Sequence, residues 1–236
     1  MTHSPQTDYR RVALFVGIIV VIVVLWDTWA VYPLRLLVVF FHELSHGVTA
    51  MATGGSIVEI RLNAREGGLC ITRGGSQFLV LSAGYLGSLI WGGVLLTLAS
   101  RTRASATVLE LLGALLLLVS IVWIRPVIGF GFLFGAAAGV AVAAAAYFVP
   151  VGVNRVLLAV IGLTSCLYAV LDIKSDILDR PHALSDAVLL AQYTGVPSVV
   201  WGTLWLILSL LVASRFLVIA CRRDPGDVTV TSVPAP

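Results

Sequence analysis

The chain has 236 residues, of which 59% are hydrophobic and 11% charged, and its formal net charge is +3. Average soluble domains carry about 25% charged residues, so this composition excludes an ordinary soluble domain and indicates an integral membrane protein. The 15 Lys and Arg residues are scattered through short loops, which argues against a nucleic-acid-binding surface. Three isolated cysteines, Cys70, Cys166 and Cys221, argue against a disulfide framework and against a cysteine-ligated metal.

Apolar segments of membrane-spanning or nearly membrane-spanning length follow one another along the chain. They predict an all-α polytopic membrane protein with about 6–7 transmembrane helices, six being the alternative because the region around Arg125 and Pro126 divides in more than one way. The polar ends predict an N-terminal tail (1–11), a single membrane domain (12–220) and a disordered C-terminal tail (221–236). The predicted spans are 12–31, 34–53, 77–99, 107–124, 126–148, 151–171 and 197–220.

The first apolar run follows Arg10 and Arg11 and superficially resembles a secretory signal. We expect a retained anchor instead, because Trp26 and Trp29, which favour a membrane interface, stand where small residues of a cleavage site would be. The positive-inside rule favours a cytosolic N-terminus. With two antiparallel first spans, the loop at 54–75 is then expected on the cytosolic side as well.

The second apolar segment contains the motif His42-Glu43-Leu44-Ser45-His46. Ionisable side chains at membrane depth cost a few kcal/mol or more each, so they usually mark a function. On a helix, His42 and His46 project from one face at the spacing that two imidazole ligands of one zinc ion need. Glu43 lies one residue round, where it can act as a general base without ligating. The motif predicts a zinc hydrolase in the membrane; the alternative is a pair of buried histidines with a packing role only.

The loop after this motif is rich in glycine and alternates apolar with polar residues. Residues 57–62 and 69–72 flank Gly67 and Gly68, a pattern that predicts a short β-hairpin. An exposed strand beside an active site can bind an extended substrate by edge pairing. A plain solvated connector is the alternative.

In the next span, Gly84, Ser88 and Gly92 recur every four residues, which predicts close helix packing rather than chemistry.

A catalytic zinc site takes three protein ligands, so a third ligand must come from elsewhere in the chain. His3 falls in the N-terminal tail and His182 in an apparent loop, which leaves acids that border a span. Asp172 directly follows the sixth apolar run, and Asp176 lies four residues later on the same helix face. We expect Asp172 to ligate the metal, with Asp176 as a supporting residue or alternative ligand. The alternative is that both are ordinary interfacial acids.

Three groups of residues carry a resemblance to a known family. They are Phe-His-Glu-Leu-Ser-His-Gly at 41–47 with the hairpin that follows, Ser-Ala-Gly-Tyr-Leu-Gly-Ser at 82–88, and Leu171-Asp172 continued by Ser-Asp-Ala at 185–187, Gly-Val-Pro at 195–197 and the tryptophans at 201 and 205. On these, over residues 34–205, the chain resembles the site-2 protease family of intramembrane zinc metallopeptidases, in particular its compact branch without a PDZ domain.

The resemblance implies hydrolysis of peptide bonds in membrane-spanning or membrane-proximal substrates. It implies Zn²⁺ as cofactor, held by His42, His46 and Asp172, and Glu43 as the base that activates the zinc water. The substrate helix would have to unwind locally before cleavage. Two elements depart from the family pattern: Asp172 is followed by Ile173 rather than glycine, and the usual upstream Asn-Pro pair is absent. The ligand assignment therefore stays open between Asp172 and Asp176.

Two other functions are compatible with the same spans. One is a non-catalytic membrane binding or regulatory protein on the same scaffold. The other is a metal transporter or sensor, which would call for polar groups along several spans, whereas here they concentrate around one site. The expected partners are a membrane protein or peptide substrate and the lipid bilayer, with no nucleic acid. We expect a multi-pass integral membrane protein of a bacterial plasma membrane.

Overall fold

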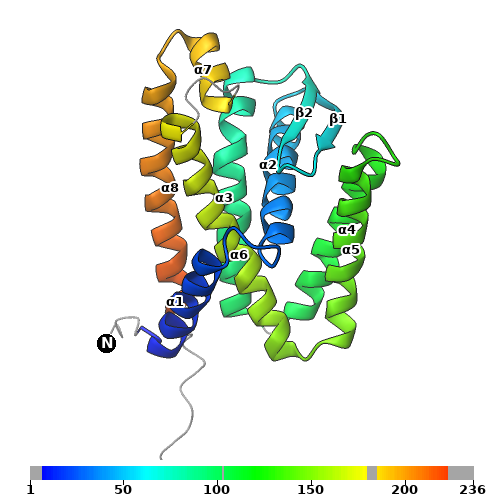
Figure 1. The fold of residues 1–236 in the computed structure, drawn as a ribbon, viewed down its shortest axis with the longest axis vertical. Coiled ribbons are helices and arrows are strands. Elements are labelled where there is room, and N and C mark those ends of the chain that lie inside the picture. Colours follow the sequence, from blue (N-terminus) through cyan, green and yellow to red (C-terminus); the bar gives the residue numbers. More distant parts are fainter. Residues whose placement is uncertain (1–6, 103, 180–184, 223–236) are drawn as a thin grey trace, which may run out of the picture.

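The computed structural model describes residues 7–102, 104–179 and 185–222, and over these ranges the protein is a helical bundle with one small sheet (Figure 1). The predicted all-α fold with a β-hairpin after the second apolar segment is confirmed. The helices are α1 (Tyr9–Val24), α2 (Tyr32–Ala52), α3 (Gln77–Arg101), α4 (Ser105–Val122), α5 (Phe130–Phe148), α6 (Val151–Lys174), α7 (Asp186–Thr194) and α8 (Ser198–Cys221); the strands are β1 (Ser56–Leu62) and β2 (Gly68–Arg73); and a π-helical turn, Ser175–Asp179, extends α6.

Among the described helices, α3, α4, α5, α8 and α6 with its extension are long and apolar enough to cross a membrane. The apolar helix α1 has 16 residues, fewer than the ~20 that a straight span needs. Helix α2 has 21 residues, and most of them face the protein interior. Most of the predicted tails, 1–6 and 223–236, lie outside the described residues; α1 begins three residues before the end of the first predicted tail.

Small residues allow the spans to pack closely. A side chain at Gly92 of α3 would lie 2.6 Å from the carbonyl oxygen of Gly162 in α6, and one at Gly162 would lie 2.7 Å from that of Gly92. Helices α4 and α5 meet in the same way, because a side chain at Gly113 would lie 2.6 Å from the carbonyl oxygen of Gly139. The predicted packing role of Gly92 is confirmed, since only glycine permits this backbone approach.

The hairpin packs on the C-terminal half of α2, where Gly47 leaves room for Ile57 of β1. The strands pair antiparallel, with an irregularity between Ile57 and Glu59. The other edge of β1 bonds to the segment after α4, because the Ile60 N–H donates to Trp123 at 2.8 Å and the Arg125 N–H donates to Ile60 at 2.9 Å. One edge of the sheet is therefore occupied, and β2 forms the other.

Helices α1 and α2 run in the same direction along α6, so the expected antiparallel pair of first spans is wrong. Arg11 lies beside Arg155 near the start of α6, whereas the Trp26 ring contacts Tyr168, 6.1 Å between centroids, near its end. His42 of α2 lies beside Asp172, later still in α6. The turn between α1 and α2 does not reverse the chain, and the N-terminal end of α1 and the hairpin lie at opposite ends of the bundle (Figure 1). A topology prediction based on apolar segments misses the parallel course of α1 and α2, because it assigns alternating directions to successive segments.

Candidate metal centre

The site is built on the buried face of α2. Pro33 lies in the first helical turn, where its missing N–H costs nothing, and an apolar run follows it. His42 and His46 project from adjacent turns with their ring centroids 4.9 Å apart. Both are largely enclosed, with 14% and 9% of their side chains exposed. The predicted projection of both histidines from one face is confirmed.

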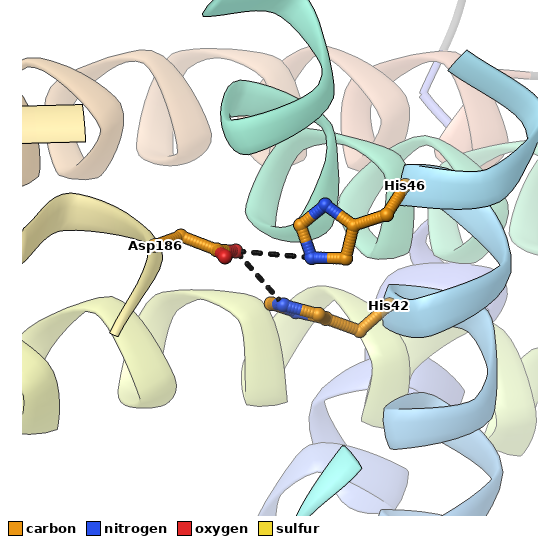
Figure 2. A group of neighbouring side chains, drawn as sticks. All are labelled: His42, His46 and Asp186. Carbon is orange, nitrogen blue, oxygen red and sulfur yellow. Dashed lines mark hydrogen bonds and ion pairs between the residues drawn. The ribbon is translucent and has the colours of Figure 1, made fainter. Parts of the chain in front are cut away.

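Asp186 faces both histidines from the first turn of α7 (Figure 2). Its Oδ2 atom lies 3.0 Å from Nε2 of His42 and 3.2 Å from Nε2 of His46. Ser185 caps α7 by accepting a hydrogen bond from the Val188 N–H, which fixes the carboxylate at the start of the helix. The analysis of the sequence gave Asp186 no role. The signal that could have found it is an acid directly after a capping serine and before an apolar helical run.

The hydrogen bond on the far side of His46 determines what its Nε2 atom can do. Nδ1 lies 2.7 Å from the carbonyl oxygen of Val80, and because a carbonyl only accepts, Nδ1 carries a proton. In neutral His46 the Nε2 lone pair then points at the Asp186 carboxylate, which is also an acceptor. Two acceptors 3.2 Å apart require a cation or a proton between them.

The donor set fits a zinc ion. Two imidazole nitrogens and one carboxylate oxygen are a common set of catalytic zinc ligands. At Zn–N and Zn–O distances of about 2.1 Å, tetrahedral ligand atoms lie about 3.4 Å apart, close to the 3.0 and 3.2 Å separations between Asp186 and the histidines. Among the described residues, this is the group of His, Cys, Asp and Glu side chains that could hold a metal ion. His3 and His182 lie outside the described residues.

A glycine of α3 leaves space for this cluster. A side chain at Gly84 would overlap Nε2 of His42 and Oδ2 of Asp186. Gly84 was expected to serve helix packing, and the structure adds a second reason for its small size. Next along α3, Gly87 gives Ser45 of α2 its space in the same way.

Glu43 is buried beside the hairpin, with 6% of the residue exposed. Its carboxylate accepts a hydrogen bond from the Cys70 backbone N–H. A side chain at Gly68 would overlap the Glu43 carboxylate, so the glycine at the start of β2 allows the strand to pass directly over it. Glu43 thus lies at the site, next to the ligand cluster, as its place one residue from His42 predicts.

The two acids predicted from α6 also line the cavity, but the group of converging ligand atoms does not include them. Asp172 Oδ2 lies 3.9 Å from Nδ1 of His42, on the other side of the ring from Asp186. Asp176 accepts a hydrogen bond of 2.5 Å from the Tyr85 hydroxyl, and the Tyr85 ring meets that of His42 edge-on. The prediction that Asp172 is a ligand stays untested, and the distances favour Asp186.

A cavity of about 620 Å³ joins these residues. One wall is β2, from Gly68 through Cys70 to Thr72. Burial is the main cause, and the nearby Glu43 carboxylate the second, that raises the pKa of the Cys70 thiol to about 12. This thiol therefore stays protonated at neutral pH and does not act as a thiolate ligand. The cysteines at 70, 166 and 221 are all free, in agreement with the prediction of no disulfide framework.

The charge at Asp186 is strongly favoured. Burial alone would raise the pKa of its carboxyl, but positive charge on the His46 and His42 rings outweighs burial and holds that pKa below its usual range. Its position in the first turn of α7 adds to this, because a helix N-terminus favours negative charge. The carboxylate therefore stays ionised where positive charge faces it.

Comparison with known proteins gave one match. A search of curated proteins and a search of solved structures found none. The model of the Peptidase M50B-like family matches residues 15–215, a range that contains α2, the hairpin, α6 and α7. The site-2 protease family expected from the motifs is thereby confirmed, and the chain belongs to the Peptidase M50B-like branch of that family of membrane metallopeptidases.

Proposed function

We propose that the protein is a zinc-dependent intramembrane endopeptidase. The observation that carries the proposal is the convergence of three potential ligand atoms, Nε2 of His42, Nε2 of His46 and Oδ2 of Asp186, next to the buried carboxylate of Glu43. Ionisable groups gathered at membrane depth are costly and usually mark a function, and these three offer the atoms that a metal cation binds. The Peptidase M50B-like match supports the reaction class.

His42, His46 and Asp186 hold the metal in this proposal. Zinc, when bound, supplies a Lewis acid that polarises the scissile carbonyl and lowers the pKa of a water molecule. The Val80 carbonyl holds the Nδ1 proton of His46, so that neutral His46 presents the lone pair of Nε2 to the metal. Asp172, beside Nδ1 of His42, is placed to orient that ring. We propose Asp186, rather than Asp172 or Asp176, as the third ligand.

Glu43 is the general base in this proposal. Its carboxylate accepts the proton of the attacking water and then returns it to the leaving amine nitrogen. The Cys70 backbone N–H, which hydrogen-bonds to this carboxylate, helps to hold it in place. Close contact with Gly68 keeps the carboxylate from rotating away from the site.

The substrate we propose is a membrane-spanning or membrane-proximal protein segment bound in extended form. β1 is bonded to β2 on one side and to the segment at 123–125 on the other. β2 instead lines the cavity that holds His42 and Glu43. Pairing with the cavity side of β2 would unwind a substrate helix and bring a peptide bond beside the base, which cleavage requires. Location in a bacterial plasma membrane stays a prediction.

Replacement of Glu43 tests the catalytic part of the proposal. Glu43→Gln removes the base but retains the size of the side chain, so we expect unchanged zinc content and folding, with peptide cleavage at least about 100-fold slower. The assay follows cleavage of membrane-protein reporters in vesicles by gel and mass spectrometry. Glu110→Gln, a change of the same type in α4, is the matched control. Wild-type rates in Glu43→Gln would contradict the proposal, and partner binding without cleavage by wild type would favour the regulatory alternative.

Zinc content tests the ligand set. We expect purified wild type to contain about one zinc per chain, and Asp186→Ala and His42→Ala to lose it, because each removes one of three ligands. Asp172→Ala should keep near-stoichiometric zinc with affinity about 10–100-fold weaker, since it removes only an orienting partner. Elemental analysis and competition with a chelating dye measure both quantities. Full zinc in Asp186→Ala together with its loss in Asp172→Ala would restore Asp172 as the ligand.

A further inference from the structure

A second cavity lies at the end of the bundle away from the metal centre. It has a volume of about 270 Å³ and is lined by the start of α1, the end of α3 and the start of α6. Leu14 and Phe15 of α1 and Val156 and Ala159 of α6 supply most of its wall. The candidate metal centre lies near the other ends of α3 and α6, so this cavity is a separate site (Figure 1).

Arginine side chains gather at this cavity. Arg11 and Arg155 line it directly. Arg11 also donates to the carbonyl oxygen of Arg222 at 3.2 Å, and Arg101 donates to the carbonyl oxygen of Ile219 at 2.7 Å, which places both of these arginines at the same end of the bundle. Arginines therefore outnumber acids in the contacts described at this end of the bundle, and an anion in the cavity would be attracted by their charge.

The two lining arginines differ in how they are held. Arg11 forms an ion pair with Asp8 at 3.4 Å, and 21% of its side chain is exposed. Arg155 is exposed, and the structure gives its guanidinium no hydrogen bond or ion pair with any residue in the described part of the chain. A guanidinium presents a fork of N–H donors that matches two oxygens of a phosphate. Arg155 is thus the free donor of this cavity, and Arg11 is the fixed one.

The apolar wall determines which anion fits. A soluble phosphate would leave Leu14, Phe15 and Val156 against water, whereas a phospholipid covers them with an acyl chain while its phosphate meets the guanidinium groups. The cavity also lies at the ends of two helices that are long enough to span a membrane, where lipid headgroups are found. We propose that this cavity is a binding site for an anionic phospholipid, with its phosphate on Arg155 and Arg11 and its acyl chain along α1 and α6.

Two variants separate the charge of the site from its shape. Arg155→Gln removes the free donor. Gly152→Leu adds a bulky uncharged side chain at the wall of the cavity, because Gly152 lines the cavity and a side chain there meets nothing within 4 Å. Arg65→Gln, on the exposed tip of the hairpin, and Gly17→Leu, at an equally open glycine of α1, are the matched controls.

The test is native mass spectrometry of the full chain in detergent with phosphatidylglycerol or phosphatidylcholine of identical acyl chains. We expect wild type and both controls to retain one phosphatidylglycerol, with affinity about tenfold above phosphatidylcholine, and Arg155→Gln and Gly152→Leu each to lose that preference. Circular dichroism verifies that every variant is folded. Equal retention of the two lipids by wild type, or wild-type preference in both site variants, would overturn the proposal. Displacement of phosphatidylglycerol by millimolar inorganic phosphate would also overturn it, because a phosphate site would then need no lipid.

Discussion

Consecutive side chains of α2 serve different parts of the site because a helix rotates by about 100° per residue. His42 and His46 face Asp186, whereas Glu43 turns toward the hairpin and meets Gly68. The proposed base can therefore lie next to the proposed ligands without competing for the same point in space. This division requires two glycines, Gly84 beside His42 and Asp186 and Gly68 beside Glu43, because in each place a β-carbon would overlap an atom of those side chains.

At Gly68, we expect replacement by alanine to impair catalysis more than stability. The new methyl group would overlap the Glu43 carboxylate, and the carboxylate can shift because it is the end of a flexible side chain. A displacement of about 1 Å at a catalytic group costs about 100-fold in rate. Cleavage assays on Gly68→Ala should show this loss, with normal zinc content and a thermal midpoint within about 3 °C of wild type.

Two comparison variants make this result specific. Gly17→Ala adds a methyl group in open space and should leave the rate unchanged. Gly84→Ala adds one against His42 and Asp186 and should lose zinc. A Gly68→Ala protein as active as wild type would show that Glu43 has another position available to it in the working enzyme.

At the level of elements, the hairpin is held over the site by its tip. Arg35 of α2 forms an ion pair of 2.9 Å with Glu66, and the Tyr32 hydroxyl donates to the carbonyl oxygen of Ala64 at 2.7 Å. The Arg35 guanidinium also lies over the Trp26 ring, 5.7 Å from its centroid. The start of α2 thus fixes the turn that leads into β2, and β2 in turn fixes the contact with Glu43.

Loss of the Arg35–Glu66 pair should loosen the hairpin locally. In Glu66→Gln we expect the free energy of local opening to fall by about 1 kcal/mol, which makes amide exchange at 63–67 about fivefold faster. Hydrogen exchange read by mass spectrometry measures this change. Arg61→Gln, which removes an exposed partner of Glu59 in β1, should leave exchange at 63–67 unchanged. Equal exchange in Glu66→Gln and wild type would mean that the Tyr32 hydrogen bond alone holds the tip.

For the whole molecule, the path of α1 and α2 along α6 separates the N-terminal end from the hairpin. Arg11 lies at the end of α3 where Ala99 and Ser100 are found, whereas the hairpin leads directly into the start of α3. Helix α3 has 25 residues and is apolar enough to span a membrane. The N-terminal end of α1 and the candidate metal centre are consequently expected near opposite faces of the membrane.

Labelling from one side of the membrane checks this topology. In a chain whose three cysteines are replaced by alanine, Arg10→Cys and Arg65→Cys each offer one exposed thiol. We expect a membrane-impermeant maleimide added to intact cells to label one of them, and the other only after permeabilisation. Labelling of both from the same side would contradict the arrangement of α1 and α2. Active enzyme in each variant is the control for correct insertion.

The sequence by itself determined those properties that depend on local pattern. Apolar run length predicted the helical membrane fold, glycine spacing predicted the hairpin, and four-residue spacing put His42 and His46 on one helix face. These predictions succeed because helix period, turn chemistry and the burial of apolar surface depend on residues that are close together in the sequence. The family motifs rest on the same short segments, which is why they could be read without a structure.

Only the tertiary structure decided which acid meets the histidines and which way the chain runs. Asp186 is 144 residues from His42, and their contact depends on how α3, α6 and α8 pack to bring α7 over α2. Asp172 satisfies the local criteria for a ligand equally well, but the helix that carries it presents the carboxylate to Nδ1 of His42, whereas Asp186 faces Nε2. The spacing of residues along one helix determines the direction in which their side chains project. A metal centre with ligands from two helices depends in addition on how those helices pack together.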